Sequence, residues 1–233
     1  MSLPKTRLTA KLRKDSIAQS ALPLFARKGL HGVTTIELAE SCGVSEALIF
    51  RHFPTKAALF NEMLQRYADF IEPASLRVDS HPPSTETLVR LVFNFVSGIV
   101  IKESTKGYQI MRLFYRSFVD DGEFASQFLR SKRLRAIRAS FAASLTEARK
   151  CGDALALPTE PENLFWFLQH MASMACLIRL PPKRAVRYEG PLAAAVDEMV
   201  RFGLRGMGLT EKALGEYASA SRFAEWRGRT AAK

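Results

Sequence analysis

Residues 34–53, TTIELAESCGVSEALIFRHF, determine the expected fold. Thr34, with Glu37 three residues later, forms the capping-box pattern that begins a helix. Gly43 suits a tight turn because glycine accepts positive φ. Ser45 is a favourable N-cap for the helix that follows. The stretch therefore predicts two short helices joined by a tight turn.

The spacing of small and apolar residues suggests how these two helices pack. Ala39 is small enough for the second helix to cross close to it, and Ile49 and Phe53 are placed to anchor that helix on a core. A steeply crossed pair of this kind is a helix-turn-helix, whose second helix enters the DNA major groove. A helical hairpin in an ordinary bundle has the same spacing, so the stretch alone leaves both interpretations open.

Helical periodicity continues through most of the chain. A first helix ends at Gly29, where glycine stops the pattern. Further helices are predicted over residues 56–71, 85–101, 107–119, 122–150, 161–179 and 190–207. The expected fold class is therefore all-α.

Composition excludes several classes of protein. Hydrophobic residues make up 47% of the 233 residues, enough for a packed core. The apolar stretch 88–101 is interrupted by Arg90 and Asn94 and is too short to cross a bilayer. The first 15 residues have no apolar segment typical of a signal peptide. Three scattered cysteines and four scattered histidines form no metal or disulfide pattern. We expect a cytoplasmic protein without cofactor, metal or membrane partner.

The charge distribution indicates an anionic partner. The formal net charge is +11, and an excess of this size favours nucleic acid first and a membrane surface second. Residues 1–12 contain basic side chains and no acid, and are expected to form either a flexible basic arm or a solubilising tail.

Three segments in order and spacing resemble the TetR family of bacterial transcriptional regulators: LFARKG (24–29), TTIELAESCGVS (34–45) and ALIFRHFPTKAALF (47–60). The resemblance implies an N-terminal three-helix DNA-binding domain over residues 13–60, extended by a linking helix over 56–71. It also implies a helical dimerisation and ligand-binding domain over 72–210, and we expect a polar tail over 211–233. No catalytic motif is present, so we expect no enzymatic activity.

The resemblance also implies which residues contact duplex DNA. Glu46 either accepts from a cytosine or favours the helix N-terminus electrostatically, and Leu48 either contacts a thymine methyl or belongs to the core. Phe50 stands where most members have tyrosine, and it lacks the hydroxyl. The implied DNA-binding residues are Thr34, Thr35, Ser45, Glu46, Ala47, Leu48, Phe50, Arg51, His52 and Lys56.

Aromatic and methionine side chains of the second domain either fill a core or leave an adaptable apolar pocket. The resemblance implies a pocket for a small apolar effector, for which we name Tyr67, Phe93, Met111, Phe114, Trp166 and His170. His170 is either a ligand contact or an ordinary core histidine. A homodimer is expected to form through residues 161–179 and 190–207.

The function expected from the resemblance is a repressor that a small effector releases from a palindromic operator. One alternative is an architectural DNA-binding protein without a ligand. Another is a helical-bundle enzyme or lipid-handling protein in which His170 or a cysteine does chemistry.

Overall fold

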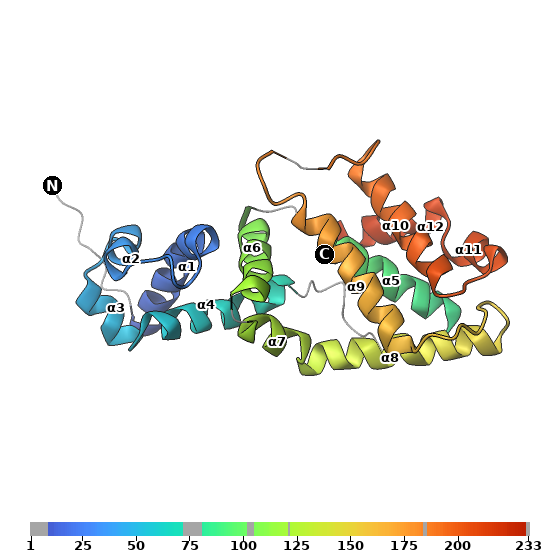
Figure 1. Cartoon of the computed structure of the whole chain (residues 1–233), viewed down its shortest axis with the longest axis horizontal. Coiled ribbons are helices and arrows are strands. Elements are labelled where there is room, and N and C mark those ends of the chain that lie inside the picture. Colours follow the sequence, from blue (N-terminus) through green and yellow to red (C-terminus); the bar gives the residue numbers. More distant parts are fainter. Residues whose placement is uncertain (1–8, 72–80, 102–104, 121, 184–185, 232–233) are drawn as a thin grey trace. The chain divides into compact units, whose positions relative to one another are not determined.

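The computed structural model describes residues 9–71, 81–101, 105–120, 122–183 and 186–231. Every regular element in these ranges is an α-helix, and the β-type pairing seen there is an isolated bridge between Ala154 and Leu209. The all-α prediction is confirmed (Figure 1). No helix in the described part of the chain is long and apolar enough to span a membrane.

The chain divides into two compact units. Unit 1 comprises residues 1–71 and 104–125, and unit 2 comprises residues 72–103 and 126–233. The boundary differs from the expected one, because residues 104–125 pack with the N-terminal helices and not with the second domain. Short helix α7 (Glu123–Leu129) spans this boundary.

Unit 1 is built around its first helix, which packs against three of the others. Phe25 and Phe60 meet edge to face at 5.0 Å between ring centroids, and Ile49, Phe53 and Leu59 are fully buried around them. The helices of this unit are α1 (Ala10–Lys28), α2 (Thr35–Cys42), α3 (Glu46–His52), α4 (Lys56–Ile71) and α6 (Thr105–Val119). The first helix contacts α2, α4 and α6.

Unit 2 is arranged around α5 (Thr85–Val100), which contacts four of its neighbours. Those neighbours are α8 (Lys132–Lys150), α9 (Pro161–Leu177), α10 (Leu192–Gly206) and α11 (Glu211–Tyr217). The last helix is α12 (Ala220–Ala231). Ten residues of α5 are buried, so it is the core helix of this unit.

The single helix predicted over residues 122–150 is wrong. The structure has α7 and α8 instead, because Ser131 adopts an extended conformation and its hydroxyl accepts a hydrogen bond from the Leu134 backbone N–H. A serine in that position begins a helix and does not continue one. Residues 10–12, expected to lie in the basic arm, form the first turn of α1, and Thr9 is the N-cap. Residues 1–8 lie outside the described residues.

The expectation of a polar tail over residues 211–233 is also wrong. Phe223 stacks on Phe93 of α5 at 4.8 Å between ring centroids, and Trp226 is 8% exposed. Arg227 forms a two-pronged ion pair with Asp197 of α10, at 2.5 and 3.0 Å. The apolar residues are sparse but lie on one helix face, so a basic composition conceals an amphipathic helix.

Candidate nucleic-acid interface

The turn between α2 and α3 has the geometry that the sequence predicts. Gly43 ends α2 in the left-handed region, with φ 62° and ψ 35°. The backbone N–H groups of Gly43 and Val44 donate to the carbonyls of Glu40 and Ala39, at 3.1 and 3.0 Å. These bonds satisfy the last carbonyls of α2 and turn the chain sharply into α3.

The capping box at the start of α2 is formed and is linked to α1. The Glu37 N–H donates to Thr34 Oγ1 at 3.2 Å, and the Thr34 N–H donates to the Glu37 carboxylate at 3.0 Å. The ammonium of Lys28 pairs with the same carboxylate. The Lys28 hydrogen bond, followed by that from the Thr34 backbone, lowers the pKa of Glu37 to about 2. Glu37 therefore stays ionised and fixes the first turn of α2.

The predicted DNA-contacting residues of α3 are distributed over its outward side. Ile49 is the inward anchor and is 3% exposed. Ala47, Phe50 and Arg51 are exposed, whereas Glu46, Leu48 and His52 are half-buried. The half-buried position of Leu48 leaves part of its side chain accessible to a thymine methyl.

Three further positions at the start of α2 are exposed or half-buried. Thr34 is exposed and Thr35 is half-buried at the start of the helix, and Ile36 is 59% exposed. Ser45 caps α3 by accepting from the Leu48 N–H at 3.2 Å, so the hydroxyl groups of Thr34, Thr35 and Ser45 lie at the beginnings of the two short helices. The Thr34 hydroxyl donates its own proton to the Glu37 carboxylate at 3.1 Å, whereas the Ser45 hydroxyl, which accepts in its cap, keeps a proton to donate to a phosphate.

Lys56 has a partner within the protein. Its Nζ donates to the carbonyl of Val33 at 2.6 Å, which joins the start of α4 to the loop before α2. An ammonium has three donors, so two remain for a phosphate. The Thr55 hydroxyl caps α4 by accepting from the Ala58 N–H at 3.0 Å.

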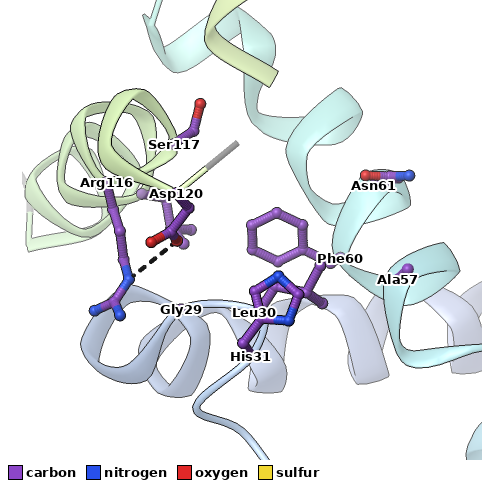
Figure 2. A pocket seen from close by; sticks show the side chains of 10 residues that line it. Gly29, Leu30, His31, Ala57, Phe60, Asn61, Arg116, Ser117 and Asp120 are labelled. Atoms are coloured by element: carbon purple, nitrogen blue, oxygen red, sulfur yellow. Dashed lines mark hydrogen bonds and ion pairs between the residues drawn. The ribbon is translucent and has the colours of Figure 1, made fainter. Parts of the chain in front are cut away.

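Arg116 of α6 lies over the C-terminal end of α1. Its Nη1 contacts the Arg27 carbonyl at 3.5 Å, and its Nε pairs with Asp120 at 3.3 Å. Gly29 has φ +71°, and a Cβ there would lie 2.3 Å from Arg116 Nε. Figure 2 shows this ion pair beside a small cavity of about 90 Å³, with His31 and Phe60 on its other side. Only glycine lets the guanidinium lie so close to the helix end.

The predicted effector residues are distributed over the two units. Phe93 is buried under α12, Met111 and Phe114 are buried in unit 1, and His170 is exposed on α9. Trp166 is half-buried, and the side chain of Tyr67 lies outside the described residues. Phe93 stacks on Phe223, so protein side chains occupy that position.

A half-open groove of about 330 Å³ lies between α8 and α9, next to Trp166. The sequence analysis missed it, because the basic run from residue 131 to 138 resembles a solvated helix face. The available signal was Phe141, three residues after Arg138 and on the same side of a helix. No group of three or more His, Cys, Asp or Glu side chains that could hold a metal occurs in the residues described.

Residues 17–63 match the model of the bacterial regulatory proteins of the tetR family. The nucleoid occlusion factor SlmA of Salmonella dublin is 34% identical over 87 residues, which cover 37% of this chain and 44% of SlmA. The SlmA of Salmonella paratyphi B matches to the same extent. The chain thus spans less than half of these curated relatives.

Solved structures share the fold over most of the chain. A tetR-family regulatory protein from Rhodococcus RHA1 aligns with a TM-score of 0.63 at 18% identity, covering 85% of this chain and 98% of that one. AibR, solved with isovaleryl coenzyme A and operator DNA, aligns with a TM-score of 0.60 at 19% identity, covering 82% and 97%. At these identities the likeness concerns the fold.

Proposed function

We propose that this chain, whose residues 17–63 match the bacterial regulatory proteins of the tetR family, is a transcriptional regulator that binds a palindromic DNA operator as a homodimer. The observation that carries the proposal is the turn at Gly43, which presents α3 outward from a buried anchor at Ile49. The family consists of DNA-binding transcriptional regulators, and a helix held in this way fits the major groove.

The ten residues named from the sequence divide into two groups with different roles. Glu46, Ala47, Leu48 and Arg51 face the base edges, because they lie on the outward side of α3. The remaining six hold the phosphate backbone and the register, and carry little sequence information. They are Thr34, Thr35, Ser45, His52 and Lys56, whose side chains offer hydrogen-bond donors, and Phe50, whose ring contributes apolar contact alone.

Selection from random duplexes tests this proposal by asking whether the protein prefers one palindrome. Arg51→Ala should then cost about 1–3 kcal/mol of binding free energy and relax the preference at one base position. Lys56→Ala should lower the affinity for every duplex sequence and reduce the slope of its salt dependence by about 1. Arg27→Ala, which removes an exposed charge from the last turn of α1, is the matched control and should leave the preference unchanged. Absence of any preferred duplex refutes the proposal.

The homodimer is supported by an unpartnered apolar surface on α9 and α10, which we call the outer face: Phe167, Met174, Leu177 and Phe202. Their exposed fractions are 61%, 57%, 39% and 70%. Exposed aromatic and methionine side chains on neighbouring helices are typical of a protein interface. Ala175 is 1% exposed and packs inside the protomer, so it cannot contact a partner.

Phe202→Glu tests the dimer. A two-fold interface meets the same substitution twice, so the variant should be monomeric in light scattering, keep its helical content and lose affinity for the palindrome. Leu155→Glu changes a side chain of similar exposure, 64%, outside α9 and α10, and should remain dimeric. A wild-type monomer at micromolar concentration contradicts this part of the proposal.

We further propose that a small effector bound in unit 2 releases the operator, so that the protein acts as a repressor. Support comes from the AibR structure, which holds both isovaleryl coenzyme A and operator DNA, and from the groove beside Trp166. If the effector lowers the affinity of the protein for the operator by some factor, linkage requires that the operator lower the affinity for the effector by the same factor. Equal effector affinity with and without operator DNA rules a compound out.

The match to a nucleoid occlusion factor favours a second candidate function, a chromosome-bound protein that acts without an effector. Chromosomal occupancy separates the two. A regulator occupies a few sites next to promoters, whereas the alternative predicts many sites that are spread over the chromosome and unrelated to promoters.

A further inference from the structure

The groove between α8 and α9 combines an apolar floor with a basic rim. Its lining consists of Arg135, Arg138, Ala139, Phe141, Ala142, Pro161, Glu162 and Phe165. Phe141 and Phe165 are buried and meet edge to face at 5.5 Å between ring centroids. A volume of about 330 Å³ falls within the range of small-molecule sites, and is far too small for a helix or a protein segment.

The rim carries more positive than negative charge. Arg138 Nη1 pairs with Glu162 at 2.6 Å, and its guanidinium lies 5.2 Å from the Trp166 ring centroid. Arg135 is exposed, and no ion pair is found for it among the residues that the structure describes. Two guanidinium groups therefore face one carboxylate, and this excess favours an anionic ligand.

The hydrogen-bonding capacity of Arg138 is incompletely used. Its side chain is 21% exposed, and its Nε is buried without a hydrogen-bond partner. A buried N–H without a partner costs free energy. A guanidinium that turns towards a ligand carboxylate regains that bond, and Arg–carboxylate pairs are commonly two-pronged.

The groove and the outer face lie on opposite sides of α9. Phe165 lines the groove, whereas Phe167 and Met174 belong to the outer face. At 100° per residue, positions 167 and 174 point roughly 180° away from position 165. A ligand in the groove is therefore compatible with the dimer proposed above.

We propose that this groove binds a small amphipathic carboxylate, whose apolar part lies on Phe141 and Phe165 and whose carboxylate pairs with Arg138 and Arg135. The inference names the chemical class of the effector and so rests on the proposed function for its regulatory meaning. It replaces the neutral apolar effector expected from the sequence by an anionic one.

Octanoate and its neutral counterpart octanamide are the probes for calorimetric titration of the full chain. Octanoate should bind saturably and octanamide at least tenfold more weakly. Shorter carboxylates should lose affinity about fourfold for each methylene no longer buried. Equal affinity for the two probes overturns the anionic assignment, and no saturable octanoate binding at millimolar concentration overturns the site.

Three variants locate the binding. Arg138→Gln should weaken octanoate at least tenfold without changing octanamide, and Ala139→Phe should weaken both by filling the groove. Lys132→Gln removes an exposed charge from α8 outside the groove and should change neither. Arg135→Gln, at an exposed position, serves if Arg138→Gln fails to fold. Octanoate affinity that survives both arginine variants overturns the assignment.

The same preparations distinguish this inference from the proposed function. Operator binding is measured without octanoate, so its absence refutes the regulator and leaves the binding result intact. Failure of octanoate to bind a protein that still prefers one palindrome refutes the groove and leaves the regulator intact.

Discussion

Gly29→Ala should destabilise the contact between α1 and α6. Gly29 has φ 71° and ψ −179°, a region that is essentially restricted to glycine and costs about 1–3 kcal/mol for other residues. The new Cβ would also lie 2.3 Å from Arg116 Nε and 2.8 Å from its Cζ. Moving Arg116 away costs up to about 1 kcal/mol for an exposed ion pair. The expected total is about 1–4 kcal/mol.

Hydrogen exchange of the α1 and α2 amides is the appropriate measurement. Both tryptophans, Trp166 and Trp226, lie in unit 2, so tryptophan fluorescence does not report on unit 1. Exchange measured peptide by peptide follows local opening directly.

Two further variants separate backbone strain from the clash with Arg116. Gly43→Ala places alanine at φ 62° with no atom within 4 Å of its Cβ, so it should cost about 1–2 kcal/mol from the backbone alone. In the double variant Gly29→Ala/Arg116→Ala the clash is absent, and its cost should fall below the sum of the two single costs. Unchanged protection of α1 in Gly29→Ala, or strict additivity in the double variant, would refute the reasoning.

Three further predictions concern individual contacts. The pKa of Glu37 is lowered from 4.5 to about 2, so its stabilising contribution is complete above pH 4.5 and is lost as the pH falls towards 2. Glu37→Gln should abolish this pH dependence of hydrogen exchange in α2. An unchanged pH profile in the variant contradicts the prediction. Asp197→Asn should lower the free energy of unfolding in urea by about 1–3 kcal/mol, because it breaks the ion pair with Arg227, whose side chain is 30% exposed. An unchanged urea midpoint would show that this ion pair does not stabilise the protein. Trp226→Ala should cost about 3–5 kcal/mol and expose Phe93 to a hydrophobic dye, and wild-type dye binding would show that α12 does not cover α5.

The parts of the fold that the sequence predicted correctly are determined by local chemistry. Thr34, Glu37, Gly43 and Ser45 each act on backbone groups within four residues, so the two short helices and the turn between them follow from spacing alone. The break at Ser131 was missed because its flanks are helical, and one capping hydroxyl was weighed against a long periodic pattern.

The groove that we propose as an effector site could not be predicted because it depends on contacts between distant parts of the chain. Met111 and Phe114 share the helical periodicity of Phe93, yet α6 packs in unit 1 and α5 in unit 2. Arg138 gains its importance from Glu162 and Trp166, which approach it only when α9 packs on α8. Helical periodicity indicates which residues are buried, but it does not indicate which other residues they contact.

The position of α12 also affects the order in which the nascent chain can fold. Phe93 receives its cover from Phe223, which leaves the ribosome 130 residues later. At the usual 5–20 residues per second, α5 therefore waits about 7 to 26 seconds for its last neighbour. The helix-turn-helix needs only local contacts and forms earlier, whereas the apolar side of α5 lacks the cover of Phe223 until α12 has been synthesised.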